Sequence, residues 1–151
     1  AADFAPAQGM DKLLTGTPPI LSLIALDIAL DVFDGLDMRQ VYAKAQSLTQ
    51  LFIEIADERL KRHGFTLASP REAARRGAQV SLAHPEGYAI MQALIARGVI
   101  GDFRAPDIVR LGFAPLTTRH VDAYDAAAAI DDIMTARAWD TEAYKARKAV
   151  T

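Results

Sequence analysis

The order in which helical and strand-like patterns follow one another constrains the fold of this chain more than any other feature of its sequence. Apolar residues first recur at helical spacing over two long stretches. Short strand candidates then alternate with helices, in the overall order helix, helix, strand, strand, helix, strand, strand, helix. This order predicts a chain of mixed α/β content whose strands belong to a small α+β domain. In that domain we expect a small mixed or antiparallel sheet of about four strands, backed by helices on one face.

The first helix has sequence signals at both ends. Thr17 suits the N-cap position, and Pro18 and Pro19 fit the first turn because amides there have no intrahelical acceptor. Gly35 stands where a glycine often ends a helix. Between these ends apolar residues surround the helix axis, so we expect this helix to be buried on most sides.

A second helix is predicted from Asp37 to about Gly64, with an apolar stripe along one side. We expect the chain to divide at its start. Residues 1–36 then form the end of a large-domain region and a helix leading onward, and residues 37–151 form a small C-terminal domain, in one compact unit overall. The other predicted elements are strands at 65–68, 78–82, 99–103 and 108–113 and helices at 85–97 and 119–137.

Two connections in the second part have distinct characters. Residues 69–77 form a charged loop, in which we expect Arg71, Arg75 and Arg76 to be solvated and partnered by Glu72. Residues 104–107 are few enough to join two strands as a hairpin.

Composition and charge exclude several classes of function. The 151 residues include no cysteine, which rules out thiol catalysis, disulfides and cysteine-ligated zinc and fits a cytoplasmic protein. The net charge of −2 gives no electrostatic case for binding nucleic acid or an anionic membrane. The longest apolar stretch, residues 20–26, is far shorter than the ~20 residues that span a bilayer. His63, His84 and His120 lack the spacing of a helical metal site, so we expect no metal.

Two residues are candidates for binding an anion. Arg110 stands within an otherwise apolar strand, where it either faces solvent on the polar side or forms a two-point clamp for an anionic ligand. Thr17 either caps the first helix or joins the free amides of that helix in an anion site. The residue pattern alone leaves both alternatives open.

Several stretches of the chain resemble kynureninases of the bacterial type. No short motif is diagnostic, but the match is colinear over essentially all 151 residues and weakens only through the last helix. The stretches that carry it are GTPPI at 16–20, RGAQVS at 76–81, HPEGY at 84–88, RGVIGDFRAP at 97–106 and RLGFAPL at 110–116.

The resemblance implies an aspartate-aminotransferase fold (fold type I) in which a large domain holds pyridoxal 5′-phosphate and a small C-terminal domain closes over the substrate. It implies hydrolysis of L-kynurenine, or of 3-hydroxykynurenine, to anthranilate and L-alanine in tryptophan degradation. The cofactor, held as a Schiff base on a lysine, stabilises the carbanions. The family is cytoplasmic and works as a homodimer with sites at the subunit boundary.

Carried over by position, Thr17 matches a contact to the cofactor phosphate and Arg110 matches the arginine that grips the substrate α-carboxylate. Arg104 matches a frequent family arginine of unassigned role, and Thr117 stands where the family usually has tyrosine, so any contact of that tyrosine is in doubt. For this role we expect Arg110 to be partly exposed and to have no strong internal acid partner.

The resemblance places no catalytic residue in this chain. Its five lysines match none of the family's catalytic positions, and we expect the Schiff-base lysine to precede Ala1 in a longer polypeptide, since the chain also begins without methionine. The chain alone is therefore expected to be inactive and not to bind the cofactor stably. The alternatives are a domain that binds an amino acid through Arg110 without chemistry, or an interaction domain with Arg110 on its surface.

Overall fold

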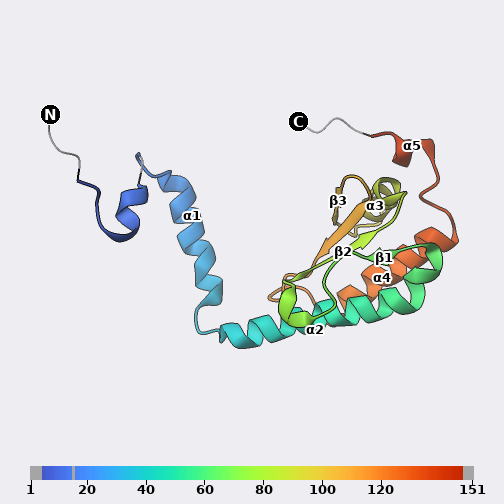
Figure 1. The fold of residues 1–151 in the computed structure, drawn as a ribbon, viewed down its shortest axis with the longest axis horizontal. Coiled ribbons are helices and arrows are strands. Elements are labelled where there is room, and N and C mark those ends of the chain that lie inside the picture. Colours follow the sequence, from blue (N-terminus) through green and yellow to red (C-terminus); the bar gives the residue numbers. More distant parts are fainter. Residues whose placement is uncertain (1–4, 15, 148–151) are drawn as a thin grey trace. The chain divides into compact units, whose positions relative to one another are not determined.

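The computed structural model describes residues 5–14 and 16–147, and the chain divides into two units, residues 1–36 and residues 37–151 (Figure 1). The first unit contains a 3₁₀ segment, Gly9–Leu13, and the helix α1, Ile20–Leu30, which a 3₁₀ turn, Asp31–Phe33, prolongs. Gly35 follows with φ at +74°, a conformation that glycine adopts without strain, as its position in the sequence predicts.

The helix α1 begins later than its sequence signals predict. Pro19 occupies the N-cap position, so the prediction that Thr17 caps the helix is wrong. The pair of prolines explains the difference. Pro19 disfavours helical geometry at Pro18, and neither proline has an N–H that a threonine cap could bind.

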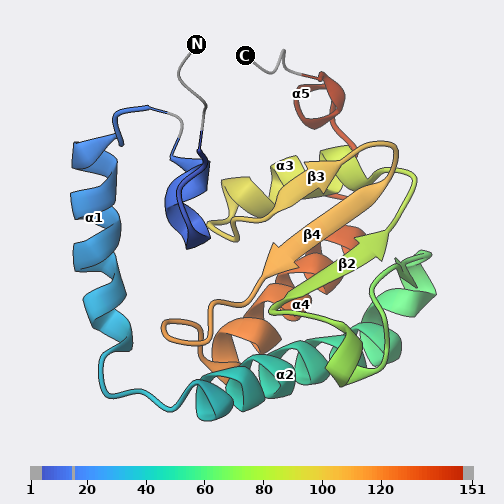
Figure 2. The ribbon, with the colours of Figure 1, turned by 60° about the vertical axis from the view of Figure 1, so that its left-hand side comes forward.

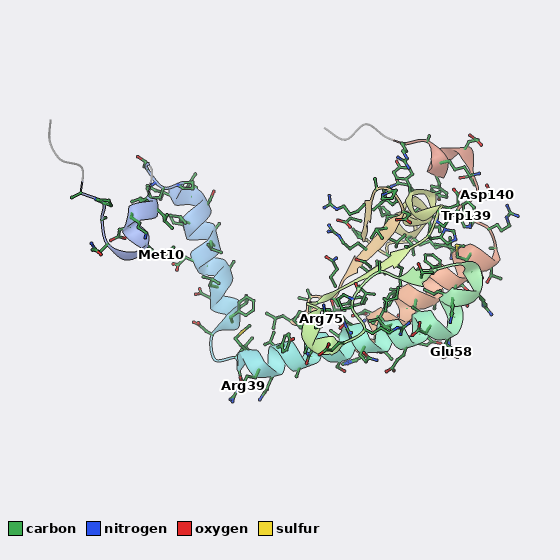
Figure 3. The ribbon with its side chains drawn as sticks, viewed as in Figure 1. Met10, Arg39, Glu58, Arg75, Trp139 and Asp140 are labelled. Carbon is green, nitrogen blue, oxygen red and sulfur yellow. The ribbon has the colours of Figure 1, made fainter. Side chains whose placement is uncertain are left out.

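The prediction that α1 is buried on most sides is also wrong for this chain. None of its residues is buried, and Leu21 is 84% exposed. Met10, in the short segment before it, is 77% exposed (Figure 3). An apolar helix needs a partner surface to bury it, and the described part of this unit offers little besides α1 itself.

The second unit contains the predicted sheet (Figure 2). Its strands lie in the order β1-β2-β4-β3 and every neighbouring pair is antiparallel, which confirms the fold class. The third strand begins at Asp102, later than the predicted residue 99. The strands are β1 (Thr66–Leu67), β2 (Gln79–Ala83), β3 (Asp102–Arg104) and β4 (Ile108–Gly112).

The helices of this unit cover one face of the sheet, with α3 and α4 behind it in Figure 2. The strand residues that face them are buried: Val80 and Leu82 on β2, and Val109 and Leu111 on β4. The alternate residues are half-buried or exposed and form the outer face of the sheet. The helices are α2 (Met38–Ile55), α3 (Gly87–Ala96), α4 (His120–Thr135) and α5 (Glu142–Lys145).

The helix α2 follows its predicted path. Asp37 is its N-cap and accepts the backbone N–H of Arg39 at 2.9 Å. After Ile55 the helix continues as a π-helix, Ala56–Leu60, and then as a 3₁₀ turn, Lys61–His63. Gly64 then ends it with φ at +91°, so the whole helical path ends where the glycine predicts.

The loop between β1 and β2 corrects a further prediction. Arg76 is buried rather than solvated, and its guanidinium donates to Thr49 Oγ1 at 3.1 Å, Gln50 Oε1 at 2.9 Å and two backbone carbonyls of the loop. Arg71 pairs with Asp57 on the π-helix, not with Glu72, at 2.6 and 2.8 Å. A buried guanidinium is tolerated only when its donors are satisfied, so these bonds hold the loop against α2.

Candidate functional site

Arg110 lies on the outer face of the sheet, at the centre of β4. Its neighbours across the sheet are Ser81 on β2 and Asp102 on β3. Its side chain is 30% exposed, which confirms the prediction of partial exposure. The face that carries it is the one the helices leave open, so the guanidinium is accessible without unfolding of the core.

Asp102 is a strong acid partner of Arg110, and the prediction that Arg110 has none is wrong. Arg110 Nε donates to Asp102 Oδ1 at 2.7 Å, and Arg110 Nη2 donates to Asp102 Oδ2. The hydrogen bonds from Arg110 lower the pKa of the Asp102 carboxyl, and the same bonds raise the pKa of Arg110. Asp102 is therefore ionised at neutral pH and accepts through both oxygens, the two-point geometry that guanidinium groups favour.

Arg104 joins the same cluster. It lies two residues after Asp102 on β3, so both side chains leave the same face of the sheet. Its Nη2 is 3.2 Å from Asp102 Oδ2, and its side chain is 63% exposed. The family arginine without an assigned role thus shares one carboxylate with the candidate clamp.

A small hollow lies beside these side chains. It is an open depression of about 250 Å³, lined by Gln79, Gly101, Asp102, Arg110 and Gly112. Gly112 leaves its part of the wall open, because a Cβ there would meet no atom within 4 Å. A carboxylate is small enough to enter such a hollow and meet the guanidinium.

Thr17 lies in the first unit, exposed and three residues before α1. The first amide of α1 with a helical acceptor is that of Leu23, which donates to Pro19 O at 3.0 Å. The amides of Ile20, Leu21 and Ser22 precede it and have no helical acceptor. A hydroxyl and unpaired amides at a helix N-terminus are the kinds of donor that can bind a phosphate.

Thr117 and the three histidines do not line the hollow beside Arg110. Thr117 is exposed in the turn after β4, where its N–H donates to Ala114 O at 3.1 Å. His63, His84 and His120 form other contacts, and no group of side chains that could hold a metal ion occurs among residues 5–14 and 16–147. In the same part of the chain no helix is long and apolar enough to cross a membrane.

A larger hollow, of about 410 Å³, opens beside β1 and the π-helix. The ion pair of Asp57 and Arg71 lies in its wall together with Lys61, and most of the remaining lining is apolar. Neither Arg110 nor Thr17 lines it. The sequence gives no motif there, so only the folded structure brings these residues together.

The helix-backed antiparallel sheet with an arginine on its open face defines a small α+β domain. The kynureninase C-terminal domain matches residues 41–130, and the chain belongs to the kynureninase family. It is 45% identical over 148 residues to a kynureninase of Pseudomonas fluorescens, covering 98% of this chain and 36% of that protein. It is also 44% identical over 148 residues to the kynureninases of Burkholderia mallei (strain SAVP1) and Burkholderia pseudomallei (strain K96243). Each of these matches again covers 98% of this chain and 36% of the relative. The chain thus spans about a third of the length of these relatives.

Proposed function

We propose that these 151 residues serve as the C-terminal part of a kynureninase, a pyridoxal-phosphate enzyme that hydrolyses L-kynurenine or 3-hydroxykynurenine to anthranilate and L-alanine. The observation that carries the proposal is the partly exposed Arg110 beside a hollow on the open face of the sheet. The complete enzyme would act in the cytoplasm as a homodimer in tryptophan degradation. We also propose that residues 1–36 end its large-domain region and that residues 37–151 form its small domain.

In this proposal Arg110 binds the α-carboxylate of the substrate. A planar guanidinium donates two parallel hydrogen bonds to a carboxylate, which fixes both the position and the orientation of an amino acid. Such a grip positions the substrate and moves no proton. Arg110 is therefore a substrate-binding residue.

Thr17 contributes a hydroxyl to the phosphate of the cofactor, together with the first amides of α1. When bound, pyridoxal phosphate supplies the electron sink that the reaction needs. One charge-assisted hydrogen bond contributes about 1.5–3 kcal/mol, whereas a micromolar site needs about 8 kcal/mol. Thr17 can therefore assist but cannot hold the cofactor by itself.

The lysine that binds the cofactor covalently is not among the five in these residues. Lys12 lies in the first 3₁₀ segment, and Lys44 and Lys61 lie along the path of α2. Lys145 pairs with Asp140, and Lys148 lies outside the described residues. The 151-residue chain alone should show neither kynureninase activity nor specific cofactor binding.

The test joins this chain to the preceding segment of the Pseudomonas fluorescens relative and measures anthranilate released from L-kynurenine. The joined protein should be active, and Arg110→Lys should lower kcat/KM about tenfold or more because lysine lacks the planar fork. The 151-residue chain, mixed with pyridoxal phosphate, should give no stoichiometric, borohydride-reducible aldimine at one specific lysine and no anthranilate. A kcat/KM of the lysine variant within about threefold of the original would contradict the clamp. An amino acid bound by the chain alone, without turnover, would favour the amino-acid-binding alternative.

A further inference from the structure

We propose that Asp102 and Arg104 are positioning residues that prepare Arg110 to bind the carboxylate of its ligand. This inference rests on the proposed role of Arg110 and adds two residues whose function is not otherwise assigned. Asp102 fixes the orientation of the guanidinium, and Arg104 offsets the charge of Asp102. The three side chains together form the carboxylate-binding unit.

The orientation of Arg110 follows from which of its nitrogens Asp102 uses. The two bonds to Asp102 engage Nε and Nη2, which form one edge of the planar guanidinium. The edge formed by Nη1 and Nη2 still has N–H groups that can donate two parallel bonds to a second carboxylate. Asp102 can therefore stay in place while a ligand binds, and it acts as a support for Arg110 and not as a competitor.

The strand register makes this support rigid. Asp102 and Arg110 are direct partners in the β3–β4 ladder, so their Cα atoms are held by the sheet itself. Arginine has several rotatable bonds, and a guanidinium that is ordered before binding loses less conformational entropy when the ligand arrives. The ion pair should therefore strengthen ligand binding more than it stabilises the fold.

Arg104 compensates the negative charge of Asp102. Without Arg104, the Asp102 carboxylate would neutralise the positive charge of Arg110 and repel the carboxylate of an incoming ligand. Arg104 Nη2 lies 3.2 Å from Asp102 Oδ2, so two guanidinium groups share one carboxylate and the cluster keeps a net positive charge. This task needs a cation near Asp102 but no particular fork, so a lysine should also perform it.

The adjacent hollow gives the ligand a place to meet the cluster. Asp102 and Arg110 both line it, together with Gln79 and two glycines. Its volume, about 250 Å³, leaves room for the carboxylate end of an amino acid beside the guanidinium.

The experiment measures KM and kcat for L-kynurenine in the joined protein described above. Asp102→Asn should raise KM about tenfold, with kcat little changed, because it weakens the support of Arg110 but leaves the reaction chemistry intact. Arg104→Gln should raise KM about threefold, less so at high salt, as expected for an exposed charge. Arg104→Lys keeps the positive charge, so this variant should have the same KM as the unsubstituted joined protein.

The controls separate this inference from the proposed function. Arg71→Gln removes an equal charge from an exposed ion pair elsewhere in the same unit and should leave KM unchanged. If the joined protein is inactive, or if its Arg110→Lys variant has the same kcat/KM as the unsubstituted protein, the proposed function fails and this inference fails with it. If Arg110→Lys is impaired while Asp102→Asn has an unchanged or lower KM, only this inference is overturned. An Arg104→Lys variant as poor as Arg104→Gln would contradict the charge role of Arg104.

Discussion

The helices α1 and α2 are both rich in apolar residues, but only α2 buries them. Every residue of α1 has solvent contact, whereas Leu48 and Phe52 of α2 are completely buried. The sequence of α2 has one apolar stripe that matches the sheet and α4 within its own unit. Hydrophobicity therefore predicts that a helix needs a covering surface, but it does not predict where that surface comes from. The second unit supplies its own core, and the described part of the first unit does not.

Replacing Phe52 with alanine should give the largest effect. Its side chain is fully buried, and its ring centroid lies 5.1 Å from that of Phe113. The cavity left behind should lower the free energy of unfolding by about 3–5 kcal/mol. Urea unfolding followed by the fluorescence of Trp139, the one tryptophan, measures the second unit directly.

Leu21→Ala is the matched control for Phe52→Ala. Leu21 is 84% exposed on α1, so its truncation should change the same free energy by no more than about 0.5 kcal/mol. A similar decrease in the free energy of unfolding for both variants would contradict the difference in burial between the two helices.

Gly101→Ala should have the next largest effect, because it tests how tightly the second unit is packed. A Cβ at this position would lie 2.6 Å from the carbonyl oxygen of Arg110 and 2.8 Å from Met91 Cε. The chain must shift to admit it, at a cost of about 1–3 kcal/mol. Gly112→Ala on the same sheet adds a Cβ with no atom within 4 Å and should be nearly neutral. Equal urea midpoints for the two variants would show that the sheet yields easily at Gly101.

Acidification should give the smallest effect and should also be confined to the second unit, since all three histidines lie there. Burial lowers the pKa of His84, whose Nδ1 accepts the N–H of Glu86 and whose Nε2 bonds His63 O. The unfolded imidazole then takes up a proton more readily than the folded one. Stability should therefore fall as the pH decreases below 6.5, the ordinary value for histidine.

The measurement compares urea midpoints between pH 7 and pH 5 for the original chain and for His84→Gln. The variant should lose less stability over this range because its side chain does not titrate. An identical loss in both proteins would assign the pH dependence to groups other than His84.

The sequence predicts the elements of the second unit well because their periodicities are long or are bounded by glycine and proline. The hairpin at residues 104–107 and the helix ends at Gly64 and Gly98 are examples. Local signals fail where an outcome depends on distant partners. Arg76 appeared solvated because its acceptors Thr49 and Gln50 come from a helix more than twenty residues earlier.

The candidate site was predicted in part. Arg110 and its partial exposure follow from strand alternation and the family match, whereas its pairing with Asp102 does not. Taking residues 104–107 as the loop would pair Phe103 with Ile108 and set Asp102 opposite Val109. In the structure Arg104 pairs with Ile108, and this shift of one position is what brings Asp102 opposite Arg110. The roles of Thr17 and Arg110 stay predictions until the experiments above are done.

The antiparallel register of β3 and β4 also limits how this protein can vary in evolution. Asp102 faces Arg110 only because the two strands are joined by a connection of fixed length. Inserting or deleting one residue there would slip the strands by one position and turn alternate side chains to the opposite face. Substitutions in the connection can be absorbed, but a change in its length separates the acid from the arginine. Loop length, more than loop sequence, is therefore the quantity that selection has to preserve at this hairpin.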